Sequence, residues 1–166
     1  MEFTHLNPDG TARMVDVSEK PPTAREAVAR GRVILGEKVF PLVRERNLPK
    51  GDLFGAARIA GILAAKRTPE LIPLCHPLPL SKVEIQFELN EEDQALEIEA
   101  RAKTVAQTGV EMEALTAVAV AALTVYDMCK GIDKGVRITD IRLVRKSGGK
   151  SGEVILEGGL HGSQKA

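Results

Sequence analysis

An uninterrupted apolar stretch in the second half of the chain constrains the fold most strongly. From Ala114 to Tyr126 every residue is apolar or Thr, while Glu111 and Glu113 precede this stretch and Asp127 and Lys130 follow it. A helix that is apolar on all sides is buried by protein or by lipid. The stretch has about 13 residues, whereas roughly 20 are needed to cross a bilayer. The sequence therefore predicts a buried core helix with charged groups at both ends.

Helix geometry separates the carboxylates at these two ends. Glu113 and Asp127 are 14 residues apart, so they lie roughly 21 Å apart along the axis and on similar faces. One helix cannot bring both to one small molecule, and we expect either a long ligand or a second subunit that completes the site. Asp127 and Lys130 are neighbours at i and i+3, which fits either a surface ion pair or an acid/base pair. Thr108 and Gly109 are expected to cap the helix.

Composition narrows the class of protein. The 166 residues carry 23 basic and 23 acidic side chains, so the net charge favours neither nucleic acid nor a membrane surface as partner. Cys75 and Cys129 cannot form a disulfide framework, and no apolar leader begins the chain. We expect a single domain over 1–166 in the reducing cytoplasm, with 1–22 as an N-terminal arm and 153–166 as a flexible tail.

Hydrophobic spacing predicts the remaining elements. Residues 23–35 fit either a helix with a capping box or an alternating strand, and Gly31 together with the β-branched pair that follows it favours the strand. The proline-rich segment 68–82 is expected to be an apolar loop that contains neither regular helix nor central strand. The other expected elements are a helix over 37–46 with Pro41 tolerated only in its first turn, a helix over 53–67, a hairpin of strands 83–89 and 96–102, and strands over 136–144 and 154–156.

The resulting order is strand, helix, strand, strand, helix, strand. It is typical of a ferredoxin-like α+β fold, in which an antiparallel sheet carries helices packed on one face. The core contains no Trp and only four Phe, so it is built from small aliphatic side chains. Such residues allow close packing of helix on sheet or of subunit on subunit.

Two local motifs have both a functional and a structural interpretation. Cys75 and His76 are adjacent, but the remaining Cys and His residues lack the spacing of a zinc site, and successive residues of an extended chain point apart. His76 is either a loop histidine with local hydrogen bonds or a substrate contact. The segment 146–152, KSGGKSG, has the composition of a phosphate-binding loop without the Walker A spacing, and the alternative is a mobile basic loop.

Four segments together closely resemble the cyclic pyranopterin monophosphate synthase family, which acts second in molybdenum cofactor biosynthesis. They are MVDVSEK at 14–20, AARIAGILAAKRTPELIPLCHPLPL at 56–80, TGVEMEALTAVAVAALTVYDMCK at 108–130 and IRLVRKSGGKSG at 141–152. The resemblance runs in order from about Thr4 to Gly152. At Ala106-Gln107 the sequence departs from the family pattern, which often has a glycine and a basic residue there.

The resemblance implies an activity and an assembly. The expected reaction converts (8S)-3',8-cyclo-7,8-dihydroguanosine 5'-triphosphate, made by a radical-SAM partner enzyme, to cyclic pyranopterin monophosphate and diphosphate. It requires no redox cofactor and no protein-bound metal. Whether Mg²⁺ accompanies the triphosphate is left open. The family is similar in fold to the ferredoxin-like arrangement and forms a homohexamer, a trimer of dimers with sites at subunit interfaces.

The resemblance also assigns candidate site residues. Asp127 is the catalytic residue with Lys130 beside it, and the two substrate segments are Leu74-Cys75-His76 and Met112-Glu113. Our hypothesis is that Asp127 tunes Lys130 for proton transfer and that Lys146 is a second acid/base group or a phosphate ligand. The cations expected to hold the triphosphate are Lys50, Lys66, Arg67 and Arg25. The alternatives are a nucleotide-binding regulatory module without catalysis and a purely structural assembly subunit.

Overall fold

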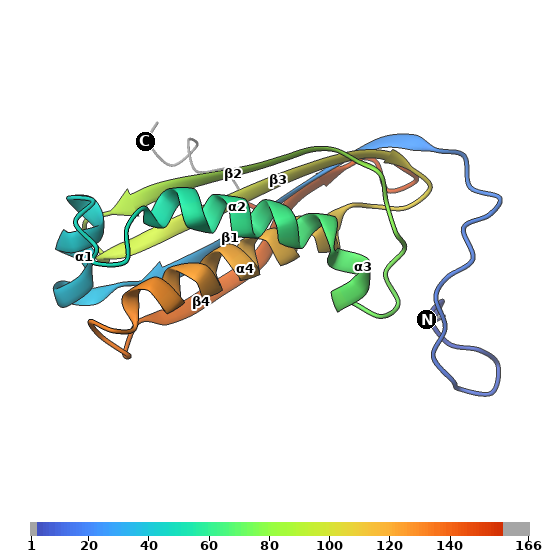
Figure 1. Ribbon diagram of the computed structural model, residues 1–166. Helices are drawn as coiled ribbons and strands as arrows, with labels where there is room; N and C mark the ends of the chain where they lie inside the picture. Colours follow the sequence, from blue (N-terminus) through green and yellow to red (C-terminus); the bar gives the residue numbers. More distant parts are fainter. Residues whose placement is uncertain (1–2, 158–166) are drawn as a thin grey trace.

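Among the described residues, 3–157, five strands form one antiparallel sheet, and two long helices cover one of its faces (Figure 1). In this computed structural model the strand order is β2-β3-β1-β4-β5, and every neighbouring pair is antiparallel. The first four strands have the order of a ferredoxin-like sheet, so the predicted fold class is confirmed. The strands are β1 (Thr23–Ile34), β2 (Leu80–Asn90), β3 (Ala95–Ala106), β4 (Arg137–Ser147) and β5 (Val154–Ile155).

The helices are placed by the loops that join the strands. α2 (Leu53–Lys66) and α4 (Glu111–Cys129) pack side by side on the sheet, whereas α1 (Gly36–Arg44) lies at one end of it (Figure 1). α3 (Thr68–Leu71) is a single turn directly after α2. Residues 3–22 extend away from the sheet at the end opposite α1 (Figure 1), as expected for an arm.

Small residues let the helices approach the sheet and one another closely. A Cβ added at Gly31 of β1 would lie 2.6 Å from Val118 Cγ1 of α4. A Cβ added at Gly61 of α2 would overlap Ile85 and lie 2.9 Å from the carbonyl oxygen of Ala117. Such distances are shorter than van der Waals contact, so both positions require glycine in this packing. The predicted close packing of a core rich in small aliphatic residues is therefore confirmed.

α4 is longer than the apolar stretch that predicted it. The helix has 19 residues and is long and apolar enough, by composition alone, to cross a membrane. It nevertheless packs on α2, β1, β3 and β4. The argument from a length of about 13 residues was therefore wrong, because polar residues at both ends extend the helix. Its packing on the sheet is what identifies α4 as a core helix.

Three local expectations were wrong. Val110 occupies the N-cap of α4 and no side chain caps the helix, so Thr108 and Gly109 do not have that role. Pro41 lies inside α1 beyond the first turn, and the buried Val39, Phe40 and Val43 stabilise this short helix by packing. The proline-rich segment does contain a helical turn, α3, because a proline is tolerated at the start of a helix.

The end of the chain is more ordered around the sheet than expected. β4 continues to Ser147, so Lys146 lies on a strand, opposite Ala27 of β1 and Val154 of β5. The short strand predicted near 154–156 is confirmed as β5. Of the tail predicted over 153–166, residues 153–157 are described, and residues 158–166 lie outside the described part.

Candidate active site

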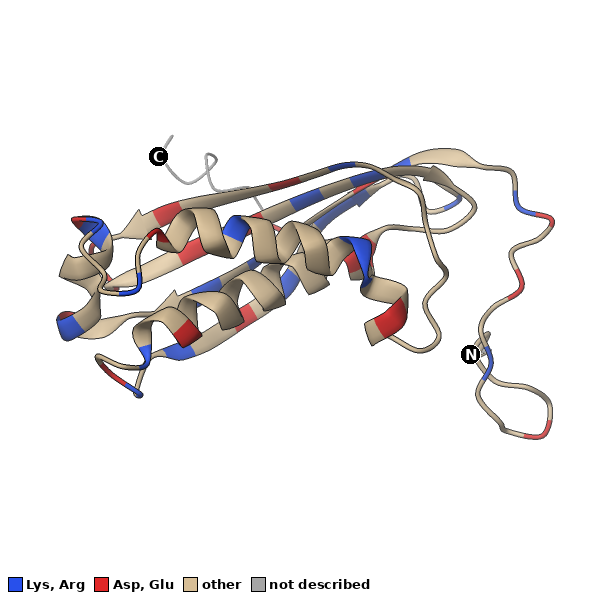
Figure 2. Cartoon of the chain, viewed as in Figure 1, with Lys and Arg blue, Asp and Glu red and all other residues tan. Residues whose placement is uncertain are grey.

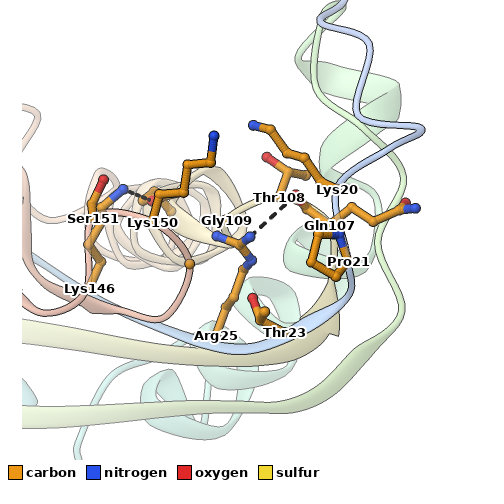
Figure 3. A pocket seen from close by; sticks show the side chains of 12 residues that line it. Lys20, Pro21, Thr23, Arg25, Gln107, Thr108, Gly109, Lys146, Lys150 and Ser151 are labelled. Carbon is orange, nitrogen blue, oxygen red and sulfur yellow. Dashed lines mark hydrogen bonds and ion pairs between the residues drawn. The ribbon is translucent and has the colours of Figure 1, made fainter.

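A cavity of about 600 Å³ opens where the amino end of α4 meets β1, the end of β3 and the loop after β4. Figure 3 shows Arg25 between the loop that carries Lys150 and Ser151 on one side and Lys20, Gln107 and Thr108 on the other. The charged side chains that line the cavity are Lys20, Arg25, Lys146, Lys150 and Glu111. Four cations and one carboxylate make this cavity suitable for an anion.

The guanidinium of Arg25 is fixed at the cavity wall by backbone carbonyls. Its Nε donates to the carbonyl of Ala106 at 3.1 Å, and its Nη2 donates to that of Gln107 at 3.3 Å. Within residues 3–157, no carboxylate oxygen lies within 4.0 Å of its nitrogens. Arg25 is therefore oriented without being neutralised.

Lys146 differs from Arg25 because it has a carboxylate partner. Its Nζ donates to Glu111 Oε1 at 2.8 Å, across the gap between β4 and the first turn of α4. Both side chains are partly buried. The pair adds no net charge, so Lys20, Arg25 and Lys150 supply the net positive charge of the cavity.

Two residues further along α4, the carboxyl of Glu113 is buried. Its residue is only 1% exposed, and its Oε2 has no hydrogen-bond partner among the described residues. The thiol of Cys75 donates to its Oε1 at 3.8 Å. Burial raises the pKa of Glu113, which favours the neutral carboxyl. Burial, followed by the charge of Glu113, raises the pKa of Cys75 to about 11, so Cys75 is a thiol and not a nucleophilic thiolate.

His76 points to a different partner from Cys75. Its Nε2 lies 2.6 Å from the carbonyl oxygen of Val15 in the N-terminal arm. It also lines a second cavity of about 350 Å³, which shares Gln107 and Thr108 with the first. Both interpretations of His76, a local hydrogen bond and a contact near a ligand, are therefore compatible with its position.

At the carboxyl end of α4, Asp127 pairs with two lysines. Lys130 Nζ lies 2.8 Å from its Oδ1, and Lys50 Nζ lies 3.8 Å from its Oδ2 while donating to its backbone carbonyl at 3.0 Å. The hydrogen bond from Lys130 lowers the pKa of Asp127 and raises that of Lys130. The carboxylate side chain is 61% exposed and both lysine side chains are 49% exposed. The predicted i, i+3 contact is present, but this end of the helix is exposed in a single chain.

The structure thus divides the predicted site residues into separate groups. Glu111 and Asp127 are 16 residues apart on α4, so the two ends of the helix are separated by roughly 24 Å. One chain does not bring Asp127 and its lysines to the cavity with Arg25 and Lys146. Met112 is half-buried in the first turn of α4, and Leu74, Lys66 and Arg67 are exposed near the end of α2 and in the loop that follows.

Several cavity residues were not singled out as site residues from the sequence. Lys20, Gln107 and Lys150 line the cavity from the arm, the end of β3 and the glycine-rich loop. The composition of the glycine-rich loop pointed to Lys150 as a possible ligand-binding residue. Lys20 could not be found in this way, because only the fold brings it to the cavity. Within residues 3–157 there is no cluster of three or more His, Cys, Asp or Glu residues that could hold a metal ion.

Comparisons with known proteins agree over nearly the whole chain. A model of the MoaC family matches residues 14–149, which include every element from β1 to β4. The chain is 65% identical to a cyclic pyranopterin monophosphate synthase of Thermomicrobium roseum, over 91% of each chain. It is 60% identical to the enzyme of that name from Heliobacterium modesticaldum, over 93% of this chain and 98% of the relative. The corresponding protein of Chloroflexus aurantiacus is 59% identical, over 92% and 93%.

Proposed function

Because the chain belongs to the MoaC family, we propose that it converts (8S)-3',8-cyclo-7,8-dihydroguanosine 5'-triphosphate to cyclic pyranopterin monophosphate and diphosphate. The family resemblance seen in the sequence is confirmed, and the chain is an enzyme of molybdenum cofactor biosynthesis. The radical-SAM enzyme that makes the substrate is its functional partner in this proposal. The overall rearrangement involves no net oxidation or reduction, so no redox cofactor is proposed.

The observation that carries the proposal is the cationic cavity at the amino end of α4. Its volume of about 600 Å³ falls in the range of pockets that bind nucleotide-sized ligands. Arg25 presents an oriented, unpaired guanidinium, and Lys20 and Lys150 add further positive charge. A triphosphate supplies the complementary negative charge. Lys66 and Arg67 do not line this cavity, and they are proposed as further ligands of the triphosphate from another part of the surface.

Formation of the cyclic phosphate requires cations near the leaving group. A substrate hydroxyl oxygen forms a bond to the phosphorus nearest the sugar and loses its proton to a basic group. The bond from that phosphorus to the bridging oxygen breaks, and diphosphate leaves with the electron pair. We assign Arg25 and Lys146 to stabilising the charge that develops on the departing diphosphate.

Lys130 is proposed as the proton-transfer group. Its pKa is raised by the hydrogen bond to Asp127, so the lysine is protonated at neutral pH and can donate to a ring nitrogen or carbon of the substrate. Asp127 orients the ammonium group, and Lys50 contacts the same carboxylate. Glu113 and Cys75, with Leu74, His76 and Met112, are proposed to bind the ring system of the substrate.

A complete site requires two chains in this proposal. The separation of roughly 24 Å between the ends of α4 prevents one helix from supplying Lys130 and Glu111 to one small ligand. A second subunit that placed the carboxyl end of its own α4 near the cavity would complete the set. Exposed apolar side chains on the helix layer, Ile59, Leu63 and Leu123, offer a surface for such contacts. We propose that the assembly is a homohexamer, a trimer of dimers.

Mixing two inactive variants tests this arrangement. Asp127→Ala and Lys146→Ala chains, each inactive alone, are unfolded and refolded together at equal amounts. Half of the sites in mixed dimers then combine the intact Asp127 of one chain with the intact Lys146 of the other. Activity should return to about a quarter of the parent rate, because random pairing makes half of the dimers mixed.

A mixture that stays inactive while its chains exchange freely would contradict the two-chain site. The parent protein must also consume the cyclised nucleotide and release diphosphate. Tight binding of that nucleotide without turnover would instead favour the regulatory module.

A further inference from the structure

Gly149 makes room for the guanidinium of Arg25. A Cβ added at Gly149 would overlap Nη1 of Arg25 and lie 2.9 Å from its Cζ. Its φ of +75° also lies in the left-handed region, which L side chains rarely adopt. The glycine loop after β4 therefore contacts the arginine through a residue that has no side chain, and Gly149 decides where the guanidinium can lie.

The orientation of Arg25 leaves donors for a ligand. A guanidinium carries five N–H groups, and the described contacts are one from Nε to Ala106 and one from Nη2 to Gln107. The group beside Gly149 is Nη1. Arginine binds phosphate oxygens through such pairs of N–H groups with defined geometry. A side chain at position 149 would displace this part of the guanidinium.

Lys150, the next residue, adds an uncompensated charge to the same part of the cavity. It is exposed, it lines the cavity, and no carboxylate oxygen of residues 3–157 lies within 4.0 Å of its Nζ. Lys146 on the other side of the loop is already paired with Glu111. One lysine and one guanidinium therefore lie around Gly149 without a carboxylate partner among residues 3–157, which fits a multiply charged phosphate group better than a single carboxylate.

We propose that the loop 148–152 forms a subsite for the diphosphate end of the substrate, with Lys150 as a binding residue and Gly149 as a positioning residue for Arg25. The inference rests on the proposed function and deepens it. During cyclisation the bridging oxygen keeps the electron pair of the broken phosphorus–oxygen bond, and this subsite holds the resulting diphosphate. Inorganic diphosphate should therefore bind here and inhibit competitively with the substrate.

The chain offers a matched control for Gly149. Gly152 in the same loop has a φ of +60°, but a Cβ added there meets nothing within 4 Å. Gly149→Ala and Gly152→Ala thus introduce similar backbone strain, and only the first displaces Arg25. Lys150→Met is compared with Lys38→Met, because Lys38 is an exposed lysine on α1 at the far end of the sheet.

Titration calorimetry of the full-length variants with inorganic diphosphate measures the effect. Gly149→Ala should weaken diphosphate binding about tenfold, the loss expected for one charge-assisted contact. It should raise KM and also lower kcat, because Arg25 is assigned to the charge that develops on the departing diphosphate. Lys150→Met should weaken binding and reduce its dependence on salt concentration. Gly152→Ala and Lys38→Met should bind like the parent protein.

Equal affinities for Gly149→Ala and Gly152→Ala, or a parent protein that turns over the nucleotide without being inhibited by diphosphate, would overturn the subsite and leave the proposed function intact. Diphosphate binding that depends on Gly149 in a protein without turnover would support the subsite and reject the proposed function.

Discussion

The two ends of α4 place carboxylates in opposite environments. At the carboxyl end, Asp127 is 61% exposed, pairs with Lys130 and Lys50, and has a lowered pKa. At the amino end, Glu113 is 1% exposed, accepts a hydrogen bond from the thiol of Cys75, and has a pKa that burial raises. One helix therefore presents an ionised carboxylate at one end and a carboxyl that favours its neutral form at the other.

This difference shows what each end lacks. The carboxyl end has a charged pair that could move a proton, but in a single chain that pair faces solvent. The amino end has a cavity with cations for phosphate groups, but its own lysine, Lys146, is held by Glu111. Their separation along the helix is the physical reason for proposing that two chains share a site.

The largest expected effect comes from removing the proton-transfer pair, Asp127 and Lys130. Lys130→Ala and Asp127→Asn should lower kcat by about 10²- to 10⁴-fold, the usual contribution of a positioned acid or base. The thermal unfolding midpoint should fall only slightly, because both side chains are exposed and an exposed ion pair contributes little stability. Turnover assays and calorimetric scans measure the two quantities. Lys134→Ala, at an exposed lysine just beyond the helix, serves as the control and should keep the parent rate.

Parent-like turnover by Lys130→Ala, in a protein that keeps its oligomeric state, would show that the exposed end of α4 has no catalytic role.

An intermediate effect is expected from changing the packing that holds the two ends in place. Gly61→Ala would insert a methyl group between α2 and α4, where it would overlap Ile85 and lie 2.9 Å from the carbonyl oxygen of Ala117. Overpacking of this kind costs about 1–3 kcal/mol. Urea unfolding measures the loss of stability. Gly131→Ala, where an added Cβ meets nothing within 4 Å, should leave it unchanged.

Equal stability of these two alanine variants would mean that α2 and α4 can move apart without cost, and that the distance between the ends is less firmly held than the packing indicates.

The smallest expected effect is a difference in how the stability contributed by the two carboxyl groups depends on pH. Because the pKa of Glu113 is raised in the folded protein above its ordinary value of 4.5, its contribution to stability is fully present below pH 4.5 and is lost as pH rises through the folded pKa. Glutamine cannot ionise, so Glu113→Gln avoids the destabilisation that a buried charge causes above the folded pKa. The variant should therefore be more stable than the parent at neutral pH but not at pH 4. Unfolding curves across this range measure the difference.

Asp127→Asn should show the opposite sign. The pKa of Asp127 is lowered from 3.8, so its contribution is present above pH 3.8 and is lost as pH falls through the folded pKa. If both variants followed the same pH dependence, the contrast between the two ends of the helix would be wrong.

Elements with a strong periodic pattern could be predicted from the sequence. The order of strands and helices was correct because alternation in β1, β2 and β3 and the apolar run of α4 reflect which face each element buries. The predictions that failed depended on local contacts. Pro41 is tolerated inside α1 because three buried residues hold that short helix, and Val110 occupies the N-cap of α4 without a side-chain cap. Neither fact has a signal in residue spacing.

The candidate site was predicted unevenly for a similar reason. Asp127 and Lys130 are neighbours through the helix repeat, so their contact could be derived from the sequence alone. Lys50 joins them only through the fold, as Cys75 reaches Glu113. These contacts join residues far apart in the chain, and no local pattern encodes such a contact.

The sequence by itself determined the order of the main strands and helices, the fold class and the family, because periodicity and long motifs are properties of consecutive residues. Only the tertiary structure decided which charges are neutralised and which are free. Burial and ion pairing depend on what the fold places within a few ångströms of each group, so Glu113 and Asp127, both carboxylates on one helix, have pKa values shifted in opposite directions.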